Sequence, residues 1–176
     1  MIEYKLVFTG TTGAGKTTAI SAISETAPIS TDVANSDTGF QKSHTTVGLD
    51  FGQITLANGD RLRLFGTPGQ SRFDFMWKIL VKDAFGLIIL IDNSRPDPLA
   101  DLDLYLKGFS EEIYTTPCVI GIGRSESHPT PSLDDFSDKL CEYQLTLPIL
   151  PVDVRLADDV IMLIDVLMAQ AESDLK

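Results

Sequence analysis

Short apolar runs alternate with amphipathic stretches along the chain. This rhythm is typical of a layered α/β domain that is built around a mainly parallel sheet. The runs that we expect to form strands are Lys5 to Thr9, Leu49 to Ala57, Arg61 to Phe65, Phe85 to Ile91, Pro117 to Ile122 and Leu147 to Val152. The run Phe85 to Ile91 is too apolar to alternate, which predicts a strand near the sheet centre with helices on both faces.

The dipeptide Asn58-Gly59 separates the second and third of these runs. Both residues tolerate positive φ, so the dipeptide is a strong signal for a hairpin with a two-residue turn. One antiparallel edge strand is therefore expected in an otherwise parallel sheet.

Helices are expected where apolar residues recur at helical spacing. The expected helical segments are Lys16 to about Ser24, the stretch that holds Leu99, Leu102, Leu106 and Phe109, Leu133 to about Tyr143, and Asp158 to Ala171. Between Ile29 and Thr46 the chain is polar and poorly periodic, which is typical of a long functional loop. With 43% hydrophobic residues in 176, the pattern predicts one domain over residues 1–176, a three-layer α/β sandwich with a six-stranded, mostly parallel sheet.

The chain is acidic, with 14 basic against 25 acidic residues and a formal charge of −11. Such a charge repels nucleic acid and anionic membrane surfaces, so neither is expected as a partner. No apolar run approaches the roughly 20 residues that span a bilayer, so we expect no integral membrane segment and a cytoplasmic location. Cys118 and Cys141 lie in apolar segments without metal-ligand spacing, which favours two buried, reduced thiols.

One segment fits the phosphate-binding pattern GxxxxGK[ST] and lies between an expected strand and an expected helix: Gly10-Thr11-Thr12-Gly13-Ala14-Gly15-Lys16-Thr17. Its glycines allow successive backbone N–H groups to point inward at phosphate oxygens, and the helix N-terminus adds partial positive charge. We expect Lys16 to reach the terminal phosphates and Thr17 to ligate Mg²⁺, with Thr18 also at the nucleotide. The alternative is a glycine-rich turn that caps a helix and binds nothing.

Two downstream segments resemble the first and second switch motifs of small Ras-like GTPases, Thr46-Val47-Gly48-Leu49-Asp50-Phe51 and Gly66-Thr67-Pro68-Gly69-Gln70-Ser71-Arg72-Phe73. With the phosphate-binding loop, or P-loop, the resemblance covers essentially the whole chain and implies a P-loop NTPase fold. The stretch from Phe65 to Trp77 resembles a bacterial branch more closely. That branch includes gliding-motility polarity GTPases and conservon-encoded ATP/GTP-binding proteins, which often pair with roadblock/LC7-type regulators.

This resemblance implies a switch that binds Mg²⁺ with GTP or GDP and signals to a partner protein. By the resemblance, Thr46 brings its hydroxyl to Mg²⁺ and its backbone to the γ-phosphate. Gly69 donates its N–H to that phosphate, and Gln70 orients the attacking water, with Lys16 stabilising the developing charge.

Two departures from the family pattern affect catalysis. Gly66 stands where most members carry an aspartate that holds a Mg²⁺-bound water, so we expect weakened Mg²⁺ affinity. Thr12 stands where many members carry glycine, and its bulk crowds the γ-phosphate, so we expect slow intrinsic hydrolysis that a partner accelerates.

The base-reading motif is degenerate. Gly123-Arg124-Ser125-Glu126 aligns with the family's Asn-Lys-x-Asp, and Asp153-Val154-Arg155 aligns with its last base-contacting loop. Arg124 can stack on a purine and Glu126 can accept from guanine donors, whereas the alternative is a solvated charged surface. GTP is the first expectation, and ATP or ADP stays open.

Two other functions stay open as well. The first is a non-hydrolysing pseudo-GTPase that serves as an interaction module, and the second is a small ATPase or nucleotide kinase. Next to the second switch, Phe73, Phe75, Met76 and Trp77 either form an effector surface or anchor a helix to the sheet.

Overall fold

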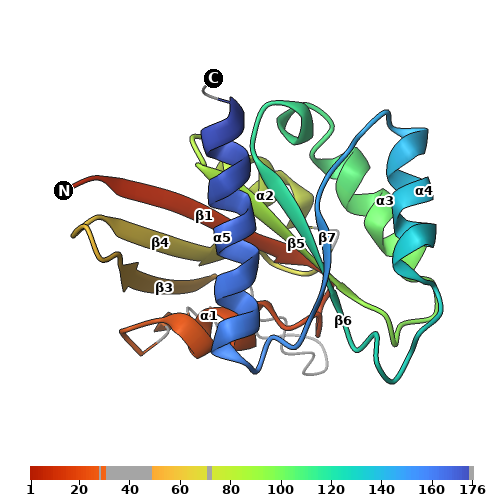
Figure 1. The fold of residues 1–176 in the computed structure, drawn as a ribbon, viewed down its shortest axis with the longest axis horizontal. Helices are drawn as coiled ribbons and strands as arrows, with labels where there is room; N and C mark the ends of the chain where they lie inside the picture. The colour runs from red at the N-terminus through yellow and green to blue at the C-terminus, as the bar shows by residue number, and fades with distance from the viewer. Residues whose placement is uncertain (28, 31–48, 71–72, 175–176) are drawn as a thin grey trace, which may run out of the picture.

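A computed structural model describes residues 1–27, 29–30, 49–70 and 73–174. Its centre is a sheet in the order β2-β3-β4-β1-β5-β6-β7 (Figure 1). The strands are β1 (Glu3–Gly10), β2 (Ile29–Ser30), β3 (Asp50–Thr55), β4 (Arg61–Gly66), β5 (Gly86–Asp92), β6 (Cys118–Gly123) and β7 (Ile149–Val152). The six predicted strands are confirmed, and the two-residue β2 extends the edge beyond β3.

Strand directions also follow the prediction. β1 pairs in parallel with both β4 and β5, and the parallel pairing continues through β6 to β7. Among the described strands, β3 alone runs opposite to the common direction, because it is antiparallel to both β4 and β2. The sheet is therefore mostly parallel with one antiparallel strand.

The β3–β4 hairpin forms, but its turn differs from the one expected. Gly59 donates to the Leu56 carbonyl at 2.8 Å, and the Leu56 N–H donates to the Asp60 carbonyl at 2.7 Å. Gly59 has φ +86°, whereas Asn58 is not among the residues with positive φ. The loop is thus a tight turn followed by one left-handed glycine, so the predicted two-residue turn is wrong.

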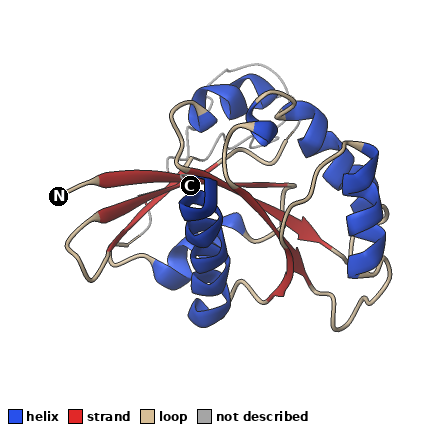
Figure 2. Ribbon diagram, turned by 45° about the horizontal axis from the view of Figure 1, so that its top comes forward, coloured by secondary structure: helices blue, strands red, loops and turns tan. Residues whose placement is uncertain are grey.

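Helices cover both faces of the sheet (Figures 1 and 2). They are α1 (Lys16–Ile23), α2 (Asp74–Val81), α3 (Pro98–Gly108), α4 (Leu133–Glu142) and α5 (Ala157–Asp174), with a short 3₁₀ turn at Glu112–Tyr114. The helices α1 and α5 pack on one face, while α2, α3 and α4 pack on the other. Alternate strand residues feed the two cores, as Phe8 and Val7 do from β1.

Local capping explains where two helices begin. Asp97 accepts from the Ala100 N–H at 3.0 Å just ahead of Pro98, which is the first residue of α3. Ser132 and Asp135 form a reciprocal capping box at the start of α4.

The second switch continues directly into α2, where Trp77 anchors the helix. The Trp77 side chain is 1% exposed, its Nε1 donates to the Pro68 carbonyl at 2.9 Å, and its ring stacks on Tyr105 at 4.7 Å. Phe75 points outward and is 59% exposed. Trp77 therefore follows the anchoring interpretation, whereas Phe75 is available to solvent.

The two cysteines differ. Cys118 is buried in β6, and burial raises the pKa of its thiol well above the usual range. Cys141 is exposed on α4, so the expectation of a second buried thiol is wrong. The buried residues of α4 are Phe136 and Leu140, and Cys141 points away from them because consecutive helical residues are rotated by about 100°. No helix in the described ranges is long and apolar enough to cross a membrane.

Candidate nucleotide-binding site

The P-loop connects the carboxyl end of β1 to the first residue of α1, and two of its glycines are required by their surroundings. A Cβ on Gly10 would lie 2.3 Å from the Leu90 carbonyl oxygen. Gly15 has φ +100°, and a Cβ there would lie 2.6 Å from Val154 Cγ2. The loop is therefore held between β5 and the segment after β7, and only glycine fits at these two points.

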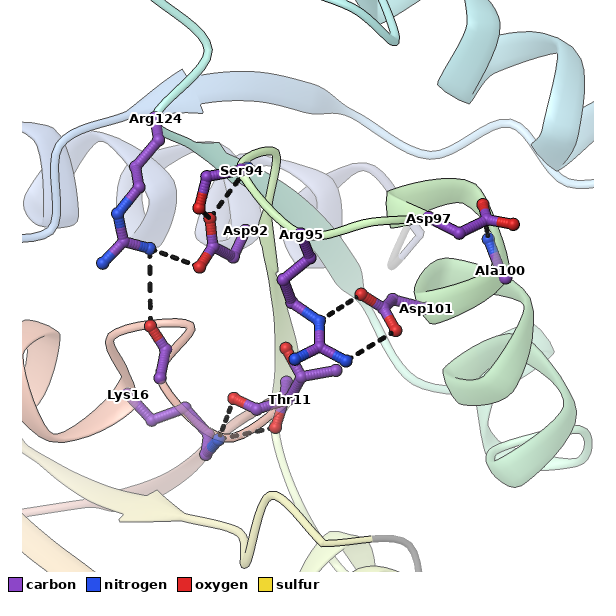
Figure 3. A network of polar contacts seen from close by, with 11 residues as sticks. Thr11, Lys16, Asp92, Ser94, Arg95, Asp97, Ala100, Asp101 and Arg124 are labelled. Atoms are coloured by element: carbon purple, nitrogen blue, oxygen red, sulfur yellow. Dashed lines mark hydrogen bonds and ion pairs between the residues drawn. The ribbon is translucent and has the colours of Figure 1, made fainter. Parts of the chain in front are cut away.

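Lys16 is held inside the curve of this loop. Its side chain is nearly buried, and Nζ donates to the carbonyl oxygens of Gly10 at 2.5 Å and Thr11 at 2.9 Å (Figure 3). Burial lowers the pKa of Lys16 to about 8, and the nearby Asp50 carboxylate acts in the opposite direction. An anion bound in the loop would favour the charged form of Lys16, because its negative charge would act against the effect of burial.

Three threonine hydroxyls lie in or near the P-loop. Thr17 donates from Oγ1 to Asp50 Oδ2 at 2.5 Å. Behind the loop, the hydroxyls of Thr9 and Thr67 lie 2.8 Å apart in a buried pair. The loop thus carries one cationic group and one hydroxyl that face a common acidic partner on β3.

A cavity of about 1220 Å³ opens beside the loop. It is lined by most of the residues that the sequence assigned to the nucleotide, namely Thr12, Gly13, Ala14, Gly15, Lys16, Thr17, Thr18, Gly69, Gln70, Arg124, Glu126, Asp153, Val154 and Arg155. Gly10 and Thr11 lie in the loop behind this lining, where they accept from Lys16. Thr46 lies outside the described residues. The structure therefore brings together described residues of four predicted segments: the P-loop, the second switch, the base-reading segment and the last base-contacting loop.

The second-switch segment lies against the P-loop. A Cβ on Gly69 would lie 2.4 Å from the Thr12 nitrogen and 2.8 Å from the Thr12 hydroxyl oxygen. Gln70 is exposed at the cavity edge. The segment is thus close enough to the loop for Gly69 and Gln70 to face a bound phosphate.

Arg124 joins the base-reading segment to the P-loop. Its Nη1 lies 2.6 Å from Asp92 Oδ2 and 3.4 Å from the Gly13 carbonyl oxygen (Figure 3). Burial raises the pKa of Asp92, but the two hydrogen bonds from Ser94 and the contact with Arg124 together outweigh it, so the pKa lies below its usual value. Arg124 has φ +59°, an uncommon backbone state for a residue other than glycine. The strand end, the P-loop and the base-reading segment are therefore tied together at one point.

Asn93 holds the rest of the base-reading segment. Its side chain is 2% exposed, and Nδ2 donates to the carbonyl oxygens of His128 at 2.6 Å and Pro131 at 2.9 Å. Glu126 lies between Arg124 and His128, and it is exposed on the cavity wall. The carboxylate lines the cavity on a segment that the Arg124–Asp92 ion pair holds on one side and the Asn93–His128 hydrogen bond holds on the other.

The last base loop is arranged by its own charges. Arg155 donates to Asp153 through both Nε and Nη2, at 2.9 and 2.6 Å, and the Asp153 N–H donates to Asp159 at 2.8 Å. The hydrogen bonds from Arg155 lower the pKa of Asp153 to about 2. Arg155 is therefore paired within its own loop and does not reach across the cavity.

Comparison with solved structures gives the fold. The G domain of the T. maritima FeoB iron transporter superposes with a TM-score of 0.66 over 96% of this chain and 99% of that chain, at 17% identity. The chain has the fold of a G domain. No family model matches the chain.

Curated relatives match over shorter segments. Intraflagellar transport protein 22 of Chlamydomonas reinhardtii is 27% identical over 62 residues, which is 34% of this chain and 32% of the relative. Ras-related protein Rab-5B of Plasmodium falciparum is 23% identical over 108 residues, which is 59% of this chain and 52% of the relative. The matched segments thus span less than two thirds of either relative.

Sequence reasoning missed three residues of the site. Asp92 and Asn93 directly follow the buried run of β5, and ligands of open α/β sheets bind at the carboxyl ends of strands. Polar residues at that point were a usable signal. Asp50 gave none, because its role depends on which strand lies beside β3.

Proposed function

We propose that this chain is a small GTPase switch: it binds GTP and GDP with Mg²⁺, hydrolyses GTP slowly and signals to a partner through its second-switch segment. The observation that carries the proposal is the buried Lys16 ammonium, which the Gly10 and Thr11 carbonyls hold in the mouth of a G-domain cavity. Within the described part of the chain, the acceptors in direct contact with this buried cation are neutral carbonyls, which suits a polyanionic ligand.

The residues divide the work as follows. The backbone amides from Gly10 to Gly15, with Thr18 after the loop, bind the phosphates. Lys16 stabilises the charge that develops on the transferred group. Thr17 and Thr46 hold Mg²⁺, which neutralises phosphate charge when it is bound. Gly69 contacts the terminal phosphate, and Gln70 orients the attacking water.

The donor set supports Mg²⁺ bound together with nucleotide. Among the residues that the structure describes, no group of three or more His, Cys, Asp or Glu could hold a metal ion alone. The Thr17 hydroxyl and the Asp50 carboxylate are oxygen donors, the type that Mg²⁺ takes in addition to water and phosphate oxygens.

Base selection rests on Glu126 and Arg124, with Asp153, Val154 and Arg155 closing the base pocket. Denaturing freshly purified protein and identifying the released nucleotide by chromatography tests the assignment. We expect a guanine nucleotide from the wild type and less from Glu126→Ala, while Glu172→Ala, an exposed substitution on α5, matches the wild type. Release of an adenine nucleotide would instead identify ATP as the substrate.

One observation favours a second function, a pseudo-GTPase that binds nucleotide without hydrolysis. The contact between Gly69 and Thr12 leaves little room where a terminal phosphate is expected. Phosphate release from the wild type and Gln70→Ala separates the two functions: a release that Gln70→Ala abolishes supports the GTPase, and equal background values support the pseudo-GTPase.

The proposed partner is a roadblock/LC7-type regulator, and the proposed setting is a bacterial cytoplasm with residues 1–176 acting as one domain. The family resemblance supports these points. Phe75 and Ile79, 59% and 67% exposed on α2, supply apolar surface next to the second switch. Co-elution with a purified roadblock protein tests the pairing, and Phe75→Ser should weaken it.

A further inference from the structure

The carboxylate of Asp50 lies against Thr17, the P-loop residue that is expected to bind Mg²⁺. Asp50 is the first residue of β3, its side chain is 7% exposed, and Oδ2 accepts from Thr17 Oγ1 at 2.5 Å. A hydroxyl has one proton to donate and two lone pairs to offer. Because Thr17 gives its proton to Asp50, its lone pairs stay available to a cation.

Asp50 also fills the space beside Gly66. The two residues are register partners on the antiparallel strands β3 and β4. A Cβ built on Gly66 would lie 3.1 Å from Asp50 Cβ and 3.2 Å from Asp50 Oδ2, with Ile20 Cδ1 at 3.3 Å. The site therefore has room for one carboxylate, which can come from either strand.

We propose that Asp50 is the positioning carboxylate of the Mg²⁺ site, acting in the place of the aspartate that position 66 lacks. It would hold the Thr17 hydroxyl in place as a metal ligand, and its negative charge would stabilise the hydrated cation. This inference rests on the proposed nucleotide-binding function.

The assignment changes the meaning of Gly66. The sequence suggested that the missing aspartate weakens Mg²⁺ binding. With Asp50 in place, Gly66 is the residue that makes space for the relocated carboxylate. An aspartate at position 66 would press a second negative charge against the first, since its Cβ would already be tighter than ordinary contact.

The experiment moves the carboxylate between β3 and β4 and measures how strongly Mg²⁺ slows nucleotide release; it does not measure hydrolysis. The dissociation rate of fluorescent GDP is measured with excess EDTA and with excess Mg²⁺. The EDTA rate divided by the Mg²⁺ rate reports how strongly Mg²⁺ slows nucleotide release. The proteins are wild type, Asp50→Asn, Asp50→Gly, Gly66→Asp and the double variant Asp50→Gly with Gly66→Asp. Asp165→Asn, an exposed charge removal on α5, is the matched control.

In Asp50→Asn the ratio should fall about 10- to 100-fold, the range seen when carboxylates that orient metal ligands are removed. Asp50→Gly should behave likewise, and the double variant should regain most of the ratio. Asp165→Asn should match the wild type. Thermal melts accompany each protein, and Asp50→Asn preserves both the volume of the side chain and an acceptor for Thr17.

A wild-type ratio in Asp50→Asn overturns the inference, and so does a folded double variant that binds GDP without regaining the ratio. Failure of the underlying function gives a different result: the wild type binds no fluorescent GDP in either buffer.

Discussion

Gly69 lies so close to Thr12 that a Cβ on Gly69 would stand 2.4 Å from the Thr12 nitrogen. The second-switch segment therefore rests on the same part of the P-loop that is expected to face the γ-phosphate. If the proposed function is correct, a bound triphosphate would compete with this contact for one space, and the second-switch segment would move when the nucleotide changes.

Removing the Thr12 side chain should relieve part of that competition, because the Thr12 hydroxyl oxygen is one of the atoms next to Gly69, whereas the backbone contact stays. We expect Thr12→Gly to raise the single-turnover rate of GTP hydrolysis about tenfold, which corresponds to about 1.4 kcal/mol of barrier. Adding Gln70→Ala to Thr12→Gly should abolish the gain, because the water would no longer be oriented. An unchanged rate in Thr12→Gly would show that Thr12 does not limit hydrolysis.

Trp77 is a built-in reporter of the second switch. It is the one tryptophan of the chain, and its indole N–H donates to the Pro68 carbonyl within that switch. We expect a non-hydrolysable GTP analogue to change tryptophan fluorescence more than GDP does, since the γ-phosphate must displace Gly69. Lys16→Ala should remove the response, and equal spectra for both nucleotides would contradict a displacement.

The buried ammonium of Lys16 should make stability depend on pH. Its pKa falls from 10.5 to about 8 in the folded, nucleotide-free protein, chiefly through burial. Between these values the unfolded chain binds more protons, so the free energy of unfolding from this group rises with pH, by up to about 3 kcal/mol.

Urea unfolding of nucleotide-free wild type and Lys16→Met across this pH range isolates the effect, because other lysines and tyrosines titrate in both proteins. As pH rises, the free energy of unfolding of the wild type should increase relative to that of Lys16→Met. Saturating nucleotide should remove this shift by keeping Lys16 charged. Parallel pH profiles without nucleotide would contradict the buried-ammonium explanation.

Asn93 should be needed for base binding because it holds the base-reading segment in place, although its own side chain is buried. Asn93→Ala leaves the His128 and Pro131 carbonyls without this donor, which should lower the free energy of unfolding by about 1–3 kcal/mol. Nucleotide affinity should fall as well, because the segment that carries Glu126 loosens. Hydrogen exchange over residues 124–131 and nucleotide titration measure both effects. Asn58→Ala, in the exposed hairpin turn, is the control: it removes two hydrogen bonds to Asp60 but should change neither the hydrogen exchange over residues 124–131 nor the nucleotide affinity.

The parts of the site that could be predicted are those formed by residues that are contiguous in the sequence. The strand, the glycine-rich loop and the helix start from Gly10 to Thr17 are contiguous, so their arrangement follows from the sequence pattern. The buried strand β5 was equally clear, because its apolar run does not alternate.

The parts that could not be predicted depend on pairing between distant segments. Asp50 reaches Thr17 because β3 folds back on β4 in a register that sets Asp50 opposite Gly66. The hairpin was foreseeable from Asn58-Gly59, but its turn geometry was not, and a turn longer by one residue changes which residues face each other. Without knowledge of this pairing, Gly66 suggested that the site lacks a carboxylate, although Asp50 lies opposite it.

The contrast between the two cysteines offers a practical route to these experiments. Cys118 is fully buried and its thiol resists ionisation, whereas Cys141 is exposed on α4, outside the cavity lining. A thiol-reactive dye should therefore attach at a single place on the native chain. Spectroscopic work on nucleotide exchange can then begin with the unmodified sequence and needs no engineered attachment point.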